Sequence, residues 1–414
     1  MRLSDVNLTD PDAFVGGVPH EMFAVLRREA PVYRHAEPDG PGFWCITKHA
    51  DVRYCSKHPE LFSSQRQGTL LRDPLPEELP MLQSIMLNMD PPQHRQYRAL
   101  VNKVFTPRTV HDLEGHVERM VTRILDRIAP LGECDFVNEI AGPLPMEVIC
   151  EMMGVPNEDR QRIYDISNQM IGSDDPDFEK PGGALADDGY MAASAEMFMY
   201  AAKLADKARR CPADDLGTAL LHAEVDGHRL SELDYNSFFL LLAVAGNETT
   251  RTVTTNGMIA LMQNPDQRRR LQDDLTRVPT AVEEMIRYNP PVHYFRRTVT
   301  RDTELRGVTL RAYDKIAMWY PAANRDEEVF ADAERFDVTR EPNDHLGFGI
   351  GEHFCLGANL ARLELHVMIR ELVRRFPDME AAGEARRLRS NFINGVKEFR
   401  VRYTPQHPIG EPAA

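Results

Sequence analysis

The stretch FGIGEHFCLG, residues 348–357, decides the fold of this chain. Glycines on both sides of Cys355 let the backbone approach a flat ligand and let amide hydrogens point at the sulfur. Residues 358–364 begin a helix, and a thiolate just before a helix N-terminus is stabilised by unpaired amides and by the helix dipole. The sequence therefore predicts a lowered thiol pKa and a cysteine suited to bind iron.

Two other interpretations of this loop are weaker. A dinucleotide-binding loop needs glycine at its sixth position, and counting from Gly347 and Gly349 that position is Glu352. A nucleophilic cysteine with His353 as its base is disfavoured, because residues two apart around a tight turn rarely face each other. A metal-ligating Cys355 is the favoured interpretation.

A long helix is predicted from Ser231, an N-cap with Asp234 at the third helical position, to Asn264 before Pro265. Its middle is apolar nearly all round, which is typical of a central, buried helix. Residues 246–250 interrupt this pattern with a glycine, an amide, a carboxylate and two threonines. A buried carboxylate is costly without a partner, so this inconsistency indicates function, and a solvated patch on an amphipathic helix is the alternative.

Elsewhere most apolar residues recur at helical spacing, and strand-like runs are confined to residues 30–47 and 292–319. Within the second run a hairpin is predicted to turn at Arg306 and Gly307. No repeat, low-complexity tract or linker divides the chain. The sequence thus predicts a mainly α fold with a minor β-sheet region.

The composition excludes several classes of protein. Of 414 residues, 42% are apolar and 27% charged, and the net charge of −15 opposes nonspecific binding to nucleic acid. The longest apolar run, residues 238–246, is far short of the roughly 18–20 residues of a membrane-spanning helix. Six cysteines without a Cys-x-x-Cys pair fit neither a disulfide framework nor a zinc site. With no secretory signal, a cytoplasmic protein is expected.

From residue 348 to Glu364 the chain closely resembles the cytochrome P450 family of heme-thiolate monooxygenases. The resemblance implies one P450 domain over residues 1–414, with a long central helix over heme b and a cysteine-ligand loop. It makes Cys355 the axial ligand of the heme iron and places Gly357 beside the cofactor. The remaining site residues follow from the same resemblance.

Heme propionates need cationic or hydrogen-bonding anchors, and the family supplies them from three parts of its chain. Here the matching residues are His94 and Arg98, four apart on one helix face, then Arg297, and then His353. In the central helix, residues 245–250 resemble the oxygen-activation motif. This likeness makes Glu248 the proton gate and Thr249 the distal hydrogen-bond donor.

A structural support is implied between the central helix and the cysteine loop. Residues 280–283 form a capping box for a short helix, and within it Glu284 and Arg287 lie three apart on one face. By family position Arg335 completes this pair. Two residues depart from the usual pattern, Tyr313 where glycine is common and Asp344 where proline is common.

The substrate pocket is placed only by family position, and its lining is mainly apolar: Met86, Val244, Ala245, Val292, Phe295, Phe392 and Ile393. Residues 294–326 and 388–395 are similar to actinobacterial members that hydroxylate sterol side chains and methyl-branched lipids. A steroid, a branched or fatty lipid, or a terpenoid is therefore the expected substrate.

The implied reaction inserts one atom of O₂ into a C–H bond and releases the other as water. The chain has no nucleotide-binding glycine motif and no cysteine set for an iron-sulfur cluster, so electrons from NAD(P)H must arrive through a separate ferredoxin and ferredoxin reductase. An acidic ferredoxin needs a basic patch near the cysteine, for which the candidates are Lys103, Arg108, Arg362 and Arg370.

The sequence leaves three alternatives to the monooxygenase. A peroxide-dependent peroxygenase needs no electron partner, but such relatives usually replace the pair Glu248 and Thr249. A heme-based sensor or ligand carrier does not need that pair either. A heme-free helical scaffold predicts colourless protein.

Overall fold

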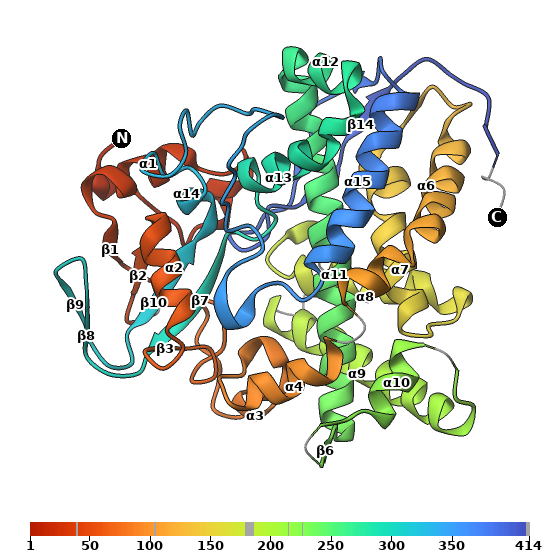
Figure 1. Ribbon diagram of the computed structural model, residues 1–414. Coiled ribbons are helices and arrows are strands. Elements are labelled where there is room, and N and C mark those ends of the chain that lie inside the picture. Colours follow the sequence, from red (N-terminus) through yellow and green to blue (C-terminus); the bar gives the residue numbers. More distant parts are fainter. Residues whose placement is uncertain (39, 103–104, 179–185, 214, 226, 411–414) are drawn as a thin grey trace.

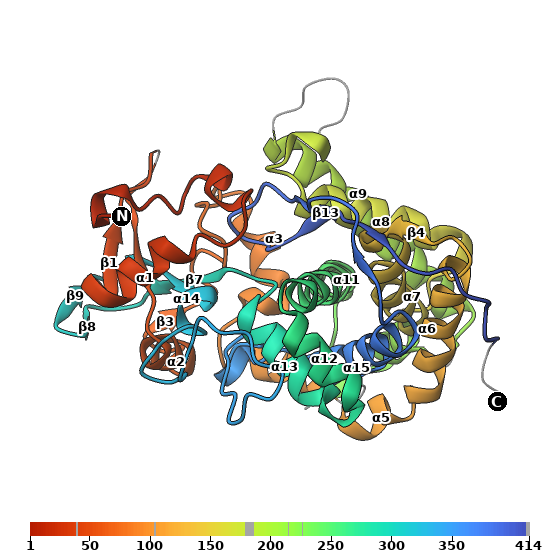
Figure 2. The same ribbon diagram turned by 90° about the horizontal axis from the view of Figure 1, so that it is seen from above.

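The computed structural model describes residues 1–414 except 39, 103–104, 179–185, 214, 226 and 411–414. Figure 1 shows two unequal parts, a large helical part and a smaller part that contains the main sheet and the N-terminal segment. Helix α11 (Glu232–Gln263) lies between them, and Figure 2 shows it nearly end-on near the centre of the molecule. The predicted fold class, mainly α with a minor β-sheet region, is confirmed.

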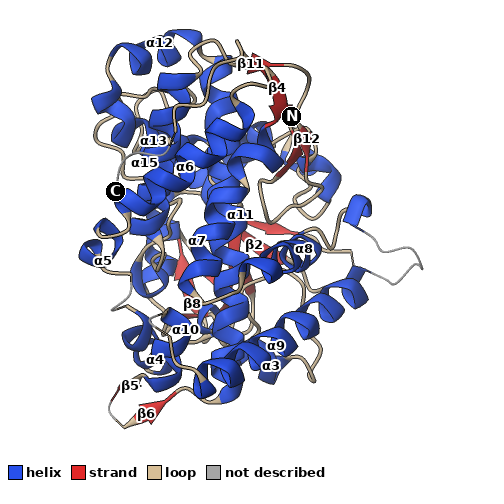
Figure 3. Cartoon of the chain, turned by 90° about the vertical axis from the view of Figure 1, so that its right-hand side faces the viewer, coloured by secondary structure: helices blue, strands red, loops and turns tan. Residues whose placement is uncertain are grey.

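Helices make up most of the chain (Figure 3). In chain order, the remaining α-helices are α1 (His20–Glu29), α2 (His49–Lys57), α3 (Leu79–Ser84), α4 (Gln93–Val101), α5 (Pro107–His111), α6 (Glu114–Ile128), α7 (Pro143–Met152), α8 (Arg160–Ile171), α9 (Ala186–Arg210), α10 (Leu216–His222), α12 (Pro265–Asp273), α13 (Val278–Tyr288), α14 (Tyr320–Ala323) and α15 (Ala358–Arg375). Short helical turns are η1 (Leu3–Asp5), η2 (Pro11–Phe14), η3 (Met86–Asn88), the π-helical η4 (Val137–Ala141), η5 (Asn157–Asp159), η6 (Pro176–Phe178), η7 (Leu275–Arg277) and η8 (Gly351–His353). Within the described part of the chain, no helix is both long and apolar enough to cross a membrane.

The main sheet has five strands in the order β1 (Val32–His35), β2 (Phe43–Ile46), β10 (Lys315–Trp319), β7 (Tyr294–Val299) and β3 (Phe62–Ser63). Strands β2 and β10 run parallel and the other neighbours antiparallel. The smaller strands are β4 (Glu133–Asp135), β5 (Glu224–Val225), β6 (His228–Arg229), β8 (Thr303–Leu305), β9 (Val308–Leu310), β11 (Glu380–Ala381), β12 (Arg386–Arg387), β13 (Val396–Glu398) and β14 (Arg400–Arg402). The predicted hairpin joins β8 to β9, with positive φ at Arg306 and Gly307.

Helix α11 begins and ends where the sequence predicts. The Ser231 hydroxyl accepts a hydrogen bond from the Asp234 amide, and the Asp234 carboxylate accepts one from the Ser231 amide. Two glycines bring neighbouring helices close to it. A Cβ at Gly246 would lie 2.7 Å from Ile149 of α7, and one at Gly257 would lie 2.6 Å from Met285 of α13. This close packing against α7 and α13 holds α11 in a fixed position.

Three local expectations are refined by the structure. Helix α13 starts at Val278 with Pro279 in its first turn, so the predicted capping box at residues 280–283 is wrong: the helix extends one turn further toward its N-terminus. Tyr313 takes the left-handed conformation that glycine usually supplies, with φ of 72°. Asp344, in place of proline, offers its carbonyl to His49 Nε2 at 2.8 Å.

Candidate active site

Cys355 is held at the N-terminal end of α15 by the glycine-rich loop. Gly349 and Gly351 have φ of 67° and 79°, which turn the chain back so that the Cys355 amide donates to the Phe348 carbonyl at 2.9 Å. The Gly357 amide donates to the Cys355 sulfur. Because α15 packs against α11, α13 and α6, the loop leaves the helical core in a fixed direction.

The predicted lowering of the Cys355 pKa is wrong for the chain by itself. Burial raises the pKa of the thiol, and this effect outweighs the Gly357 amide, Arg98 and Arg362, which all lower it. The helix terminus and nearby cations therefore favour the thiolate without being sufficient to form it. A metal cation bound to the sulfur would supply the missing stabilisation.

The four predicted anchor residues come together near this loop. The His94 and His353 rings lie 4.3 Å apart between centroids. Burial, followed by the charges of Arg297, His94 and Arg98, lowers the pKa of His353 well below its usual value. Residues from α4, β7 and the cysteine loop thus concentrate positive charge and ring nitrogens in one place.

These groups have few acidic partners of their own. Among the described residues, neither Arg98 nor Arg297 forms an ion pair, and Arg297 donates one N–H to the Arg296 carbonyl at 2.7 Å. His94 Nδ1 has no hydrogen-bond partner and lies 3.9 Å from a Glu352 carboxylate oxygen. Buried cationic groups without partners are unstable unless an anion is bound. Two carboxylates at the edge of a heme fit this donor set, and the thiol of Cys355 fits its iron.

On α11, the two predicted catalytic side chains point to different surroundings. Glu248 is buried, forms an ion pair with Arg251, and accepts a hydrogen bond from the Thr252 hydroxyl at 3.2 Å. Thr249 is half-buried and donates to the Ala245 carbonyl one turn earlier, at 2.7 Å. Adjacent helical residues differ by about 100° in direction, so this divergence is expected from their positions.

A space opens beside the same helix turn. Ala245 is exposed and Val244 half-buried, although α11 packs against α3, α7, α8, α9 and α15. Val292 pairs with Ile393 through an isolated antiparallel bridge, and the Phe295 and Phe392 rings lie 5.8 Å apart. Met86 is buried in the same apolar cluster that contacts Val244. The predicted pocket residues therefore form two groups, one on α11 and η3 and one around Phe392.

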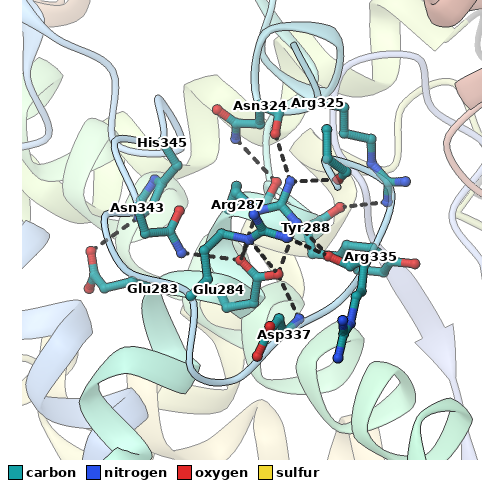
Figure 4. A network of polar contacts seen from close by, with 12 residues as sticks. Glu283, Glu284, Arg287, Tyr288, Asn324, Arg325, Arg335, Asp337, Asn343 and His345 are labelled. Atoms are coloured by element: carbon teal, nitrogen blue, oxygen red, sulfur yellow. Dashed lines mark hydrogen bonds and ion pairs between the residues drawn. The ribbon is translucent and has the colours of Figure 1, made fainter. Parts of the chain in front are cut away.

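The predicted pair Glu284 and Arg287 lies at the centre of a polar network (Figure 4). Both side chains are completely buried, and Arg287 donates twice to Glu284 at 2.7 and 2.8 Å. Arg287 also donates to the carbonyls of Asn324 at 2.8 Å, Ala333 at 2.8 Å and Arg335 at 3.0 Å. One arginine thereby holds three points of the segment that leads to the cysteine loop.

The prediction that the Arg335 side chain completes this pair is wrong. Arg335 contributes only its backbone carbonyl, and the second guanidinium at Glu284 is that of Arg340, with Nε 3.1 and 3.2 Å from the two carboxylate oxygens. The Asn343 amide donates to the same carboxylate at 3.1 Å. Arg340 and Asn343 carried no sequence signal beyond their place in the same irregular segment.

The basic patch expected for an electron donor is weaker than predicted. Lys103 lies outside the described residues. Arg362 is bound to Glu283 and Arg370 to Glu118, whereas Arg108 is exposed near the start of α5. Charges already neutralised by ion pairs contribute less to attracting an acidic partner.

Known proteins share this architecture and sequence. A family model described as Cytochrome P450 matches residues 198–382. A methyl-branched lipid omega-hydroxylase of Mycobacterium tuberculosis is 44% identical over 415 residues, covering 97% of this chain and 95% of that protein. A steroid C26-monooxygenase of Rhodococcus jostii is 40% identical over 407 residues, covering 96% of this chain and 84% of that protein. The chain belongs to the cytochrome P450 family.

A solved P450 also has the same fold. The structure of a Mycobacterium marinum cytochrome P450 in complex with pseudoionone superimposes with a TM-score of 0.87 at 38% identity, covering 93% of this chain and 94% of that one. The predicted family and enzyme class are confirmed: the chain is a P450 monooxygenase, and the family uses heme and O₂.

A pH-dependent contribution to the stability of this P450 is expected from Glu283. Burial by itself raises its pKa, but hydrogen bonds from Arg362 at 2.7 Å and His345 at 3.1 Å outweigh burial and lower the pKa to about 2. A depressed carboxyl pKa stabilises the folded state above the unfolded value of 4.5, and this contribution disappears as the pH falls through 2.

Glu283→Gln is therefore expected to lower the free energy of unfolding at pH 7 by about 1–3 kcal/mol. The difference from the parent protein should shrink steadily between pH 5 and pH 2, as measured by denaturant unfolding at several pH values. A difference that does not change with pH would show that the ion pair is not its cause.

Proposed function

We propose that this P450 hydroxylates a C–H bond of a hydrophobic lipid, namely a steroid, a branched or fatty lipid, or a terpenoid. The observation that carries the proposal is the apolar group around Phe295, Phe392 and Ile393, together with the exposed apolar turn at Ala245 on α11. An apolar pocket with few polar groups binds its ligand by removing apolar surface from water. The names of the steroid and methyl-branched lipid relatives support the same substrate class.

Each site residue is proposed to have one task. Cys355 supplies the axial sulfur ligand, the Gly357 amide donates to that sulfur, and the predicted anchor residues (His94, Arg98, Arg297 and His353) bind the two propionates. When bound, the heme activates O₂, and a thiolate ligand favours cleavage of the O–O bond. Glu284 and Arg287 hold the segment before the loop.

Glu248 and Thr249 are proposed to control protons on the distal side. Glu248 carries a proton toward the pocket from outside it, and its carboxylate is held in place by Arg251 and by the Thr252 hydroxyl. The Thr249 hydroxyl, which now donates to the Ala245 carbonyl, reaches the pocket by rotating about χ1. The hydrogen bond to the Ala245 carbonyl is thus the resting state of this hydroxyl, which donates into the pocket after the rotation.

The proposed electron source is NAD(P)H through a ferredoxin reductase and a ferredoxin that docks near Arg108. The proposed setting is the cytoplasm. None of the six cysteines forms a disulfide, which is the usual state in a reducing compartment. Residues 1–414 are proposed to act as one P450 unit.

Binding of a lipid panel tests the substrate class. Purified holoenzyme is titrated with steroids, methyl-branched lipids, straight fatty acids and terpenoids, and displacement of the water ligand of the heme iron is followed as a shift of the heme absorption. We expect micromolar binding, equivalent to about 8 kcal/mol, for at least one class. Failure of every lipid, together with binding of small polar compounds, would contradict the proposal.

Thr249→Ala is expected to uncouple electron use from product formation. Without the hydroxyl, NAD(P)H is still oxidised but hydrogen peroxide is released, and the product formed per reducing equivalent falls by about 10- to 100-fold. The control is Thr255→Ala, since Thr255 makes the same type of bond to the Arg251 carbonyl at 2.9 Å farther along α11. Full coupling in Thr249→Ala would remove Thr249 from the mechanism.

A further inference from the structure

Ser64 lies beside the four anchor residues, on a turn to which none of them belongs. It directly follows strand β3, whose last residue, Ser63, is paired with Thr298 of β7. Continuing this antiparallel register by one residue brings Ser64 opposite Arg297, and residues opposite each other point to the same face of a sheet. The main sheet therefore directs Ser64 to the face that carries the Arg297 side chain.

The Ser64 hydroxyl contacts one of the anchors directly. Its oxygen lies 3.3 Å from His353 Nε2, and among the described residues this ring is the one hydrogen-bond partner of the hydroxyl. A well-formed hydrogen bond of a hydroxyl group is about 2.8 Å long, so this contact is a loose one. A hydroxyl has one hydrogen to donate and two lone pairs. Ser64 therefore retains the capacity to donate to a stronger acceptor.

Ser64 is as deeply enclosed as the anchors themselves. Its exposed fraction is 1%, compared with 1% for His94 and 4% for Arg297. The charges of Arg297, His94 and Arg98 all act on the His353 ring, so these groups and the Ser64 hydroxyl surround the same imidazole. A carboxylate oxygen bound at His353 Nε2 would share the surroundings of that nitrogen with the Ser64 hydroxyl.

Asp90 holds Ser64 through its backbone. One carboxylate oxygen of Asp90 accepts a hydrogen bond from the Ser64 amide at 2.8 Å, and the other accepts one from the Ser63 hydroxyl. The Ser63 oxygen in turn accepts the amides of Gln65 and Arg66, each at 3.1 Å. None of these bonds uses the Ser64 hydroxyl, so the turn keeps its supports when that hydroxyl is removed.

The charges at this place favour a neutral donor. Burial lowers the pKa of both His94 and Arg297, and the negative charge of Asp90 opposes this shift. A further buried cation would add its own cost of desolvation. A serine hydroxyl donates to an ionised carboxylate without that cost, and hydrogen bonds to ionised groups are the strong ones.

We propose that the Ser64 hydroxyl is a fifth donor to the heme carboxylates, and that Asp90 is the positioning residue that holds it there through the Ser64 amide. The inference rests on the proposed role of the four anchors. When heme binds, the hydroxyl donates to a propionate oxygen in place of its loose contact with His353 Nε2. A hydrogen bond disperses the negative charge of the propionate, so the hydroxyl both slows heme loss and raises the reduction potential of the iron.

Heme release from the holoenzyme measures the strength of this bond. Parent and Ser64→Ala proteins are mixed with an excess of apomyoglobin, and transfer of heme is followed by absorption. We expect release on the order of tenfold faster in Ser64→Ala. The matched control is Ser56→Ala, because Ser56 is a buried serine of α2 whose hydroxyl donates to Met318 Sδ at 3.4 Å. It should release heme at the parent rate.

The vibrations of the propionates separate this role from a purely structural bond to His353. The propionate bending band in the resonance Raman spectrum responds to hydrogen bonds at the carboxylates. We expect it to shift in Ser64→Ala and to keep its position in Ser56→Ala. The reduction potential of the iron, measured by spectroelectrochemical titration, should be lower in Ser64→Ala than in the parent.

A double-mutant cycle tests the part assigned to Asp90. Asp90→Ala removes the acceptor of the Ser64 amide, so it should also speed heme release and shift the propionate band. Because both residues act through one hydrogen bond, the double variant Ser64→Ala/Asp90→Ala should release heme no faster than Asp90→Ala. Effects that simply add would remove Asp90 from the proposal. If Asp90→Ala does not fold, Ser64→Ala still decides the role of the hydroxyl.

Two results would overturn the role of Ser64. One is heme release in Ser64→Ala at the parent rate. The other is faster release without a shift of the propionate band, which would show that the hydroxyl only supports His353. Absence of the sulfur-bound ferrous spectrum with carbon monoxide in the parent would instead overturn the proposed function, whereas an intact spectrum with an unchanged propionate band overturns this inference alone.

Discussion

Arg287→Met is expected to destabilise the folded protein by about 3–5 kcal/mol, because it leaves the completely buried Glu284 carboxylate without its main cation. It also removes the only side-chain donor, among the described residues, to the carbonyls of Asn324 and Ala333 and one of the two to the Arg335 carbonyl, so the segment before the cysteine loop loses its contacts with Arg287 of α13. Denaturant unfolding gives the free energy, and heme retained after gel filtration reports the state of the loop.

The double variant Glu284→Leu/Arg287→Met distinguishes charge burial from lost attachment. Removing both charges avoids the unpaired carboxylate and should recover part of the unfolding free energy. Heme retention should remain poor, since the carbonyls of Asn324 and Ala333 still lack the donor that Arg287 supplied. Arg340→Gln is the control at the edge of the network. It should lower the free energy of unfolding by less than Arg287→Met does, because Arg287 remains paired with Glu284. Equal destabilisation by Arg287→Met and Arg340→Gln would contradict the central place given to Arg287.

Cys355→Ser is expected to abolish the absorption of sulfur-bound ferrous heme with carbon monoxide and to reduce turnover below detection. A serine oxygen is a poorer electron donor to iron than a thiolate, which is the ligand that favours O–O cleavage. The measurement is the difference spectrum of the reduced protein with and without carbon monoxide, together with product formation.

Cys211→Ser is the matched control for this substitution. Cys211 is an exposed free thiol after α9, so its replacement should leave both the spectrum and the turnover unchanged. An intact sulfur-bound spectrum in Cys355→Ser would show that another residue binds the iron. The assignment of the cysteine loop, and of the residues around it, would then be wrong.

The features that could be predicted from sequence are those in which neighbouring residues determine the geometry. The cap at Ser231 and the apolar run after it predicted α11, and the glycines around Cys355 predicted the tight loop. Arg340 was missed because its contact with Glu284 is made across 56 residues, through an irregular segment in which nothing fixes the register. Local patterns cannot choose between two arginines in such a segment.

The electrostatic surroundings of buried groups are the second feature that could not be predicted from the sequence. The position of Cys355 before a helix indicated a stabilised thiolate, but the amount of surrounding protein, which raises the pKa, depends on the whole fold. The Arg251 contacts show the same limit. Its spacing from Glu248 marks a helical ion pair, whereas Tyr164 and Asn168 reach it from another helix.

The parallel pairing of β2 with β10 has a consequence for synthesis of the chain. Phe43 lies beside Lys315 and Ile46 beside Met318, so the first two strands have no central partner until the ribosome has passed residue 319. Contacts between such distant segments form slowly. During translation the hydrogen-bonding edge of β2 that later pairs with β10 stays open, and an unpaired strand edge in a long nascent chain is a site that chaperones protect.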